Sequence, residues 1–204
     1  MNWLAHLYLS KPTAEYRFGN LLPDFAKPPE YNQLSAEIMH GVACHHCIDS
    51  FTDAHPAFRR SVARISAPYR RFGGIVIDVF YDHLLTVGWA HLSSVPLKNF
   101  IGGFYEELAG FEGVIHGSVF ERFRQMKQAD ILSSYHEMAG VELALARIAR
   151  RLRSNIPLER AAEDLRLNYD SLCEDFAVFF PELRGRVEQF QESQSQRIEC
   201  AVRS

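Results

Sequence analysis

The stretch CHHCIDSFTD, residues 44–53, combines cysteine, histidine and aspartate, side chains that bind metals and transfer protons. Two interpretations compete for it. In the first, the Cys44–Cys47 pair binds zinc or works as a redox pair; in the second, the interleaved histidine and aspartate residues carry the chemistry. The two interpretations lead to different proteins, and helical geometry separates them.

Helical rotation gathers the histidine and the aspartates on one face of this stretch. At about 100° per residue, with His45 at 0°, Asp49 falls at about 40° and Asp53 at about 80°. Cys47 falls at about 200° and Cys44 at about 260°. On a continuous helix the cysteines therefore lie outside a site formed by the other three residues. No second Cys-x-x-Cys supplies further zinc ligands, so we interpret the cysteines as small buried apolar side chains.

A second cluster, DVFYDH at residues 78–83, places Asp78 and Asp82 four residues apart on one helical face. The neighbouring residues are mostly large and apolar, and an ionised carboxylate in such surroundings is costly unless it is paired or bound to a metal. Two carboxylates on one face indicate a bound cation. The alternative is that one is exposed and the other pairs with an arginine.

Two weaker signals lie nearer the N-terminus. Asp24 follows GNLLP, where a carboxylate is also common as a turn or cap residue. His6 lies in an apolar stretch, where a lone histidine is more often a hydrogen-bonded core residue. These residues and both clusters nevertheless all fall within the first 83 residues, and that concentration favours an active site.

A mixed set of histidine and carboxylate ligands suits Mn²⁺, Fe²⁺, Mg²⁺ or Zn²⁺ and disfavours a site made of thiolates. Such an ion lowers the pKa of a bound water and polarises a phosphoryl oxygen, so hydrolysis of a phosphate ester is the natural chemistry. The chain has no Walker-type phosphate loop and no Rossmann glycine fingerprint, which argues against nucleotide-driven transfer and dinucleotide redox chemistry.

The elements that must position these residues are helices. Apolar residues recur at three- and four-residue spacing almost throughout, no pair of alternating strands is evident, and proline and glycine punctuate the pattern. We therefore predict one all-α domain, a single-domain helical bundle over residues 1–204. The expected helices cover 2–9, 13–22, 32–54, 57–66, 73–91, 97–109, 118–153 with a break near Asp130, and 158–200 with a break at Pro181.

Composition excludes several classes of protein. With 47% apolar and 23% charged residues, the 204-residue chain is typical of a globular domain. Its net charge of −3 argues against a general nucleic-acid binder. The most apolar stretch carries two aspartates and a histidine, so we expect no membrane span. The N-terminus has no basic region before its apolar run, and four scattered cysteines suit a reducing compartment, so we expect a cytoplasmic protein.

Four motifs together resemble a known family. MNWLAHLYLS, GNLLPDF, the His45-x₃-Asp49-x₃-Asp53 helix followed by His55-Pro56, and DVFYDH are similar, in this order, to the bacterial acyl-carrier-protein phosphodiesterases, or holo-ACP hydrolases. The resemblance implies an all-α, HD-phosphohydrolase-like domain in which a divalent metal, often manganese, assists cleavage of the phosphodiester that joins 4′-phosphopantetheine to a serine of acyl carrier protein. The chain departs from the usual HD pattern, because its pair reads Asp82-His83.

The resemblance assigns roles to the residues singled out above. We predict that Mn²⁺, with Mg²⁺ or Fe²⁺ as alternatives, is bound by side chains in the first 83 residues. His6 or Asp53 is expected to position the attacking water or to protonate the leaving group. The predicted metal ligands are Asp24, His45, Asp49, Asp82 and His83.

Acyl carrier proteins are small and acidic, so an enzyme that acts on them needs a basic surface near its metal. Residues 58–72 contain five arginines and no acidic residue, and they lie between the two candidate metal helices. A solvated basic face is the alternative for this run. A second basic group, Arg147, Arg150, Arg151 and Arg153, is interpreted as an exposed helix face. The predicted partner-binding residues are Arg59, Arg60, Arg64, Arg70 and Arg71.

Two other functions stay open at this point. An HD-like phosphohydrolase acting on a small phosphate ester or nucleotide uses the same metal set but does not need the basic run at 59–71. A non-catalytic helical binding module needs no stoichiometric metal at all. Salt dependence and arginine substitutions distinguish the first from the carrier-protein hydrolase, and metal analysis distinguishes the second.

Overall fold

The computed structural model describes residues 1–31, 33–153 and 155–202. Over these ranges the chain consists of α-helices and short 3₁₀ turns and contains no strand, which confirms the all-α prediction. Within the same ranges no helix combines the length and the apolar composition that a membrane crossing requires. That the chain is one domain over 1–204 stays a prediction.

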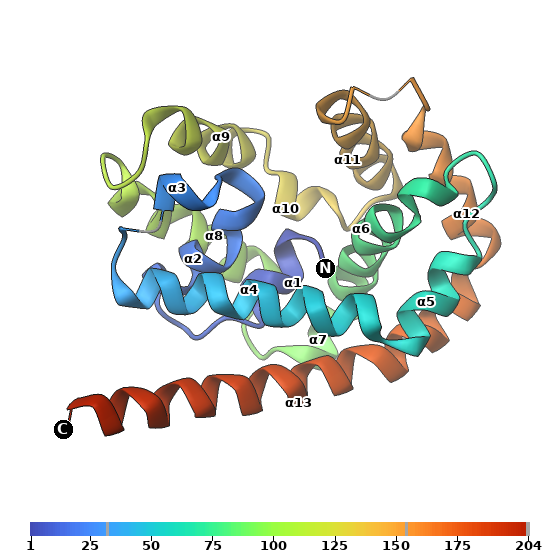
Figure 1. Cartoon of the computed structure of the whole chain (residues 1–204). Coiled ribbons are helices and arrows are strands. Elements are labelled where there is room, and N and C mark those ends of the chain that lie inside the picture. Colours follow the sequence, from blue (N-terminus) through green and yellow to red (C-terminus); the bar gives the residue numbers. More distant parts are fainter. Residues whose placement is uncertain (32, 154, 203–204) are drawn as a thin grey trace.

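The helices are short except for α4 and α13, as Figure 1 shows. In chain order the elements are α1 (Trp3–Tyr8), α2 (Ala14–Phe25), α3 (Pro28–Tyr31), α4 (Ala36–Ala54), α5 (Pro56–Ala63), η1 (Arg70–Phe72), α6 (Gly73–Val87), α7 (Trp89–Leu92), α8 (Leu97–Glu107), η2 (Leu108–Phe111), α9 (Gly117–Gln128), α10 (Ile131–Ser134), α11 (Met138–Arg151), η3 (Leu158–Ala161), α12 (Ala162–Leu167) and α13 (Tyr169–Val202).

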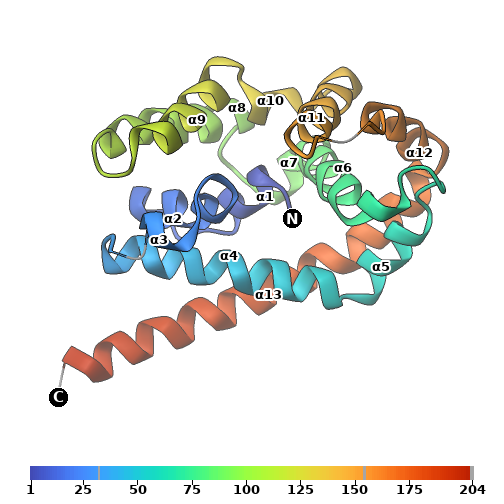
Figure 2. The same cartoon turned by 45° about the horizontal axis from the view of Figure 1, so that its top comes forward.

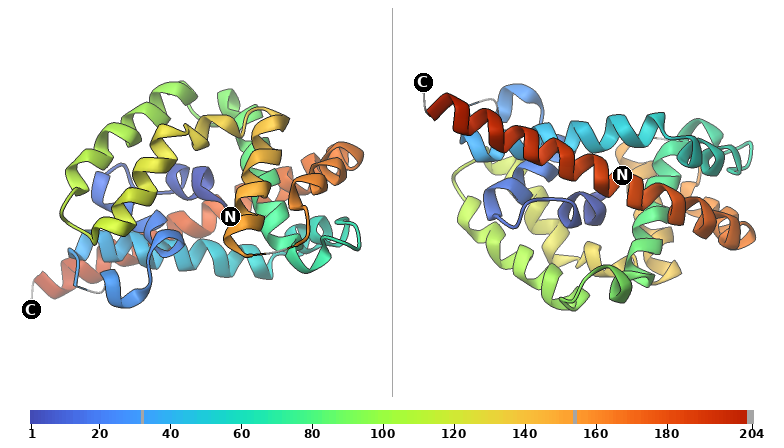
Figure 3. Two further views of the ribbon diagram at one scale, coloured as in Figure 1. Left: turned by 90° about the horizontal axis from the view of Figure 1, so that it is seen from above. Right: turned by 90° about the horizontal axis from the view of Figure 1, so that it is seen from below.

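Helices α1, α2 and α4 lie between a group of helices on one side and the long helix α13 on the other. In Figure 2, α8, α9, α10 and α11 lie together on one side and α13 lies on the opposite side. Figure 3 shows α13 spanning the molecule alongside α4, on which it packs. The N-terminal part of the chain, which contains α1, α2 and α4, therefore lies at the centre of the molecule. The sequence concentrates its histidines and aspartates in this part.

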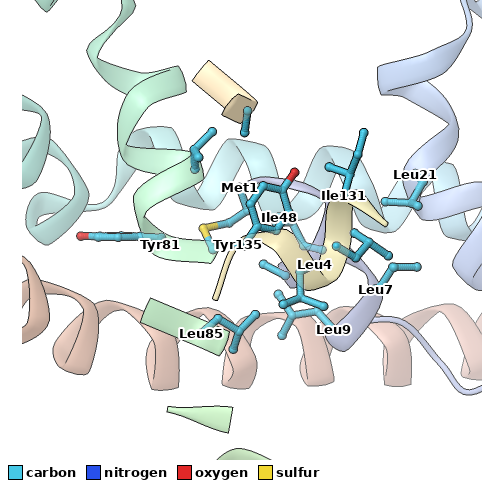
Figure 4. Close-up of a cluster of buried hydrophobic side chains, with 14 of the residues drawn as sticks. Met1, Leu4, Leu7, Leu9, Leu21, Ile48, Tyr81, Leu85, Ile131 and Tyr135 are labelled. Carbon is cyan, nitrogen blue, oxygen red and sulfur yellow. The ribbon is translucent and has the colours of Figure 1, made fainter. Parts of the chain in front are cut away.

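The core surrounds α1 on all sides. Leu4 and Leu7 of this six-residue helix are fully buried, and Figure 4 shows them together with Leu21 of α2, Ile48 of α4 and Leu85 of α6. Burying one such side chain contributes roughly 1.5–3 kcal/mol. A helix this short has little stability in isolation, so these tertiary contacts hold it in place.

Two glycines bring α2 and α4 into close contact. A Cβ atom on Gly19 would lie 2.1 Å from the carbonyl oxygen of Ile38, and one on Gly41 would lie 2.2 Å from that of Tyr16. Both distances are far inside van der Waals contact, so only glycine lets the two backbones approach this closely. The close approach allows side chains of α4 to reach the backbone of α2.

The main errors in the predicted boundaries occur at two prolines and at short breaks between helices. The predicted break at Pro181 is wrong, because α13 continues through it; Phe179, Phe180 and Leu183 are buried there and hold the helix together. Helix α2 likewise passes Pro23 and ends at Phe25. The predicted helix 73–91 divides at Gly88, and the segment 118–153 divides into three helices rather than two.

Candidate metal centre

His6, Asp49 and His45 form a compact cluster where α1 meets α4. The Nε2 atom of His45 lies 3.0 Å from Oδ2 of Asp49, and Nε2 of His6 lies 3.3 Å from Oδ1 of the same carboxylate. The two imidazole rings are stacked, with centroids 4.2 Å apart and planes inclined by 15°. One ligand atom from each residue falls within 4.8 Å of the others. Metal–ligand bonds of about 2.0–2.2 Å fit a set of this size.

Asn20 of α2 orients both imidazoles. The backbone oxygen of Asn20 lies 2.7 Å from Nδ1 of His45, and its side-chain Oδ1 lies 3.0 Å from Nδ1 of His6. With Nδ1–H donating to Asn20, each ring presents Nε2 toward Asp49. An N–H bond of this kind on the far side of the ring is the usual support of a metal-binding histidine. The Nδ2 group of Asn20 donates to the oxygen of His6 at 2.8 Å and is thereby fixed itself.

The ionisation of the cluster follows from burial and proximity. Burial lowers the pKa of His6, and the neighbouring His45 lowers it further. Burial also lowers the pKa of His45, but the hydrogen bond and the charge of Asp49 outweigh it and raise the pKa above its ordinary value. Burial raises the pKa of Asp49, yet its contacts with His45 and His6 and the positive charge of the Met1 amino group hold it well below the usual range. The carboxylate is therefore ionised at neutral pH and available to a cation.

A positive charge already lies beside the cluster. The α-amino group of Met1 is 3.3 Å from Oδ1 of Asp49 and 3.1 Å from Oδ1 of Asp78. Burial lowers the pKa of this amino group, but the two carboxylates outweigh burial and raise it to about 11. Burial raises the pKa of Asp78 to about 6, although the amino group lowers it. The position between these two carboxylates thus favours a cation.

Two further predicted residues lie near the cluster without belonging to it. Asp24, in the last turn of α2, is close enough for its charge to raise the pKa of His45. Asp53 is exposed on α4, one turn beyond Asp49, and its charge contributes to the raised pKa of Asp78. Neither carboxylate has an atom in the three-residue cluster among the described residues.

The structure gives the other two predicted ligands different surroundings. Both oxygens of Asp82 accept hydrogen bonds from backbone N–H groups at the start of α1, from Leu4 at 2.9 Å and Ala5 at 3.0 Å. His83 points elsewhere, with Nδ1 donating to the oxygen of Tyr135 at 2.9 Å. Asp82 thus holds the start of α1 in place, and Nδ1 of His83 is bound to the backbone of Tyr135, which follows α10. That Asp82 and His83 are metal ligands stays a prediction, whereas His6, predicted to act on water or the leaving group, lies in the cluster itself.

The cysteines of the opening motif lie outside the cluster. Cys44 is fully buried, and burial raises its pKa to about 11. Its sulfur lies 3.7 Å from Nδ2 of Asn20 and is not among the grouped ligand atoms of His6, His45 and Asp49. Within the described residues Cys44, Cys47 and Cys173 are free thiols.

The predicted basic surface divides into two parts. Arg60 and Arg64 form ion pairs with the buried carboxylate of Asp175 on α13, with Nη2 of Arg60 at 2.7 Å from Oδ1. The other three arginines, Arg59, Arg70 and Arg71, are exposed. Two of the five predicted partner-binding residues therefore connect α5 to α13, and three remain for a partner.

We expect Asp175→Asn to lower the free energy of unfolding by about 2–3 kcal/mol, because it leaves two guanidinium groups without their counter-charge. The effect stays below that of a fully buried pair because the side chain of Arg60 is 55% exposed. Thermal unfolding should shift by roughly 5–10 °C, with the exposed Asp170→Asn as control. A variant that unfolds with the wild type would return Arg60 and Arg64 to the candidate partner surface.

Asn20 is a positioning residue that no sequence motif singled out. It lies inside the motif GNLLPDF, but the signal there was the carboxylate of Asp24. A polar residue on an otherwise apolar helix face is the pattern that marks it, since Asn20 is fully buried between Phe18, Leu21 and Leu22.

The cluster can bind one divalent ion and leave coordination positions open. Two imidazoles and one carboxylate are a common ligand set for a catalytic metal, with room for water and substrate at the open positions. The side chain of Asp49 is 41% exposed, so the carboxylate side of the cluster is reached from solvent. Such an ion would polarise a phosphoryl oxygen and lower the pKa of a bound water.

Comparison with known proteins shows the family of this chain. The chain is similar to the acyl carrier protein phosphodiesterases of Photorhabdus laumondii, 27% identical over 92% of this chain and 96% of the relative, and of Yersinia enterocolitica, 29% identical over 92% and 98%. That of an Enterobacter strain is 29% identical over 90% and 95%. No solved structure matches, so the HD-phosphohydrolase likeness stays a prediction. A profile of the acyl carrier protein phosphodiesterase family matches residues 1–183, and the chain belongs to that family.

Proposed function

We propose that this protein is a metal-dependent phosphodiesterase that removes 4′-phosphopantetheine from holo-acyl carrier protein and leaves the apo form. The observation that carries the proposal is the cluster of His6, His45 and Asp49, a catalytic type of metal site in a chain of the acyl carrier protein phosphodiesterase family. The chain matches relatives named acyl carrier protein phosphodiesterase over nearly their whole length.

His6, His45 and Asp49 would hold the ion, and Mn²⁺ is the metal that we propose for this mixed set of nitrogen and oxygen ligands. When bound, the ion supplies a nucleophilic water at neutral pH and stabilises charge on the phosphoryl group. Asn20 keeps both imidazoles turned toward the site. Asp53 and Asp24 are the nearby carboxylates that can position a water or pass a proton, provided that the substrate brings them within hydrogen-bond reach.

The partner surface that we propose is narrower than the sequence predicts. Arg59, Arg70 and Arg71 are exposed and offer positive charge to an acidic carrier protein, whereas Arg60 and Arg64 are already paired. We place the reaction in the cytoplasm, where free thiols such as Cys44 and Cys47 stay reduced.

The test is the conversion of holo- to apo-carrier protein by purified protein with Mn²⁺, read as the mass difference between the two forms. Turnover should depend on the metal, and binding of the carrier should weaken at high ionic strength. A protein that turns over a nucleotide or another small phosphate ester but leaves holo-carrier protein intact with Mn²⁺, Mg²⁺ and Fe²⁺ would support the alternative phosphohydrolase instead. A stoichiometric metal content that never appears would support a binding module.

A further inference from the structure

A cavity opens beside the metal cluster and is not used by it. Its volume is about 180 Å³, and it lies between the N-terminal segment, the end of α2, α6, and the helices α10 and α11. It shares Met1 and Asp78 with the cation position next to Asp49, and Asp24 with the surroundings of His45. A ligand bound in this cavity therefore contacts residues that flank the metal cluster, although the three residues of the cluster do not themselves line it.

Arg147 of α11 brings a buried, unpartnered donor to this cavity. Its Nη1 atom is inaccessible to solvent and has no hydrogen-bond partner. Arg147 also forms no ion pair among the described residues, although Asp24 and Asp78 line the same cavity. A guanidinium donor that is buried without an acceptor is destabilising, and a bound anion would supply the missing acceptor.

A second donor points to the same requirement. The Nδ2 group of Asn2, which also lines the cavity, is buried without a hydrogen bond of good geometry, although it lies near Tyr135. Two donors without acceptors in one cavity call for a ligand that brings acceptor oxygens. Arginine suits a phosphate group in particular, because its planar fork of N–H groups matches two phosphate oxygens.

Apart from Tyr135 and Arg151, the rest of the cavity wall is apolar. Branched side chains predominate, so the cavity suits a short aliphatic group attached to the anion. The apolar lining consists of Trp3, Ile75, Val79, Ile131, Ala144 and Ile148.

We propose that this cavity is the subsite for the phosphodiester of the substrate and for the dimethyl-substituted carbon chain next to it, with Arg147 binding a non-bridging phosphate oxygen. The inference rests on the proposed function for the identity of the substrate. It also revises the interpretation of the second basic group, since Arg147 faces the cavity rather than solvent. Arg150 lies three residues further along the same helix. It is exposed, and its Nε donates to the backbone oxygen of Ala146.

The experiment compares Arg147→Gln with Arg150→Gln, a matched removal of charge on the same helix. Binding of free 4′-phosphopantetheine and of inorganic phosphate is measured directly by calorimetry on the Mn²⁺-loaded protein, and turnover of holo-carrier protein is measured in parallel. Loss of one charge-assisted hydrogen bond corresponds to about 10–100-fold in affinity and in kcat/KM. We expect this loss in Arg147→Gln, a partial recovery in Arg147→Lys, and wild-type behaviour in Arg150→Gln, with metal content and Tm unchanged in all three.

The outcomes separate the inference from the proposed function. If Arg147→Gln binds 4′-phosphopantetheine as well as Arg150→Gln does, the subsite is overturned even if the wild type turns over carrier protein. If the wild type does not act on carrier protein but binds 4′-phosphopantetheine in a way that depends on Arg147, the proposed function fails and the subsite stands. Equal affinity for inorganic phosphate and 4′-phosphopantetheine would overturn the apolar half of the inference.

Discussion

Asp49→Asn is expected to remove the bound metal and to lower the rate of holo-carrier-protein hydrolysis by about 10³-fold or more. Among the described residues, Asp49 is the one carboxylate in contact with both histidines of the cluster, so it would supply the negative charge that balances a bound ion. Loss of about 4 kcal/mol of transition-state stabilisation corresponds to about 10³-fold in rate, which is within the contribution of a catalytic metal.

The asparagine keeps the size of the side chain, so the fold should be retained. Metal content is measured by elemental analysis after purification without chelator, and turnover is measured by mass across a range of Mn²⁺ concentrations. Asp170→Asn, an exposed carboxylate on α13, is the control and should keep both. Full metal occupancy together with wild-type turnover in Asp49→Asn would place the metal elsewhere and argue against the cluster.

The sequence predicts two of the three residues of this cluster through local geometry. His45 and Asp49 are one helical turn apart on α4, so rotation alone brings them together. His6 comes from a different helix, and nothing local in its apolar stretch indicates that α1 lies against α4. That contact depends on the close packing of α2 on α4 at Gly19 and Gly41, which no spacing rule in the sequence specifies.

The carboxylates of Asp78 and Asp82 have partners that the sequence does not reveal. Both carboxylates need compensation for burial, as their apolar neighbours in the sequence predict. Asp82 finds it in two backbone N–H groups of α1, donors that every helix start leaves unpaired and that a sequence motif does not reveal. The sequence also does not reveal the partner of Arg60, because Asp175 is 115 residues away in sequence but in contact with Arg60 in the fold.

Asp82→Ala is expected to lower the free energy of unfolding by about 2–4 kcal/mol and to weaken metal binding without touching the three-residue cluster. The substitution leaves the N–H groups of Leu4 and Ala5 buried without acceptors, each at a cost of about 1–3 kcal/mol. Because His6 lies on the same short helix, a loosened α1 also misplaces one imidazole of the cluster. Chemical denaturation gives the stability, and titration of the metal-free protein with Mn²⁺ gives the affinity. Asp82→Asn keeps one acceptor oxygen and should lose about half as much stability.

The pH dependence of stability in metal-free protein shows whether the protonated or the ionised form of the Asp82 carboxyl group stabilises the fold more. Burial raises the pKa of Asp82 to about 7, although the hydrogen bonds from Leu4 and Ala5 lower it, whereas an unfolded aspartate titrates near about 3.9. Between about pH 4 and 7 the folded chain therefore keeps a proton that the unfolded chain releases, so the contribution of Asp82 to stability falls as pH rises through that window. The difference in unfolding free energy between wild type and Asp82→Asn should accordingly be smaller at pH 8 than at pH 5. A difference that grows toward pH 8 would mean that the two backbone donors outweigh burial and that the ionised carboxylate is the form that holds α1.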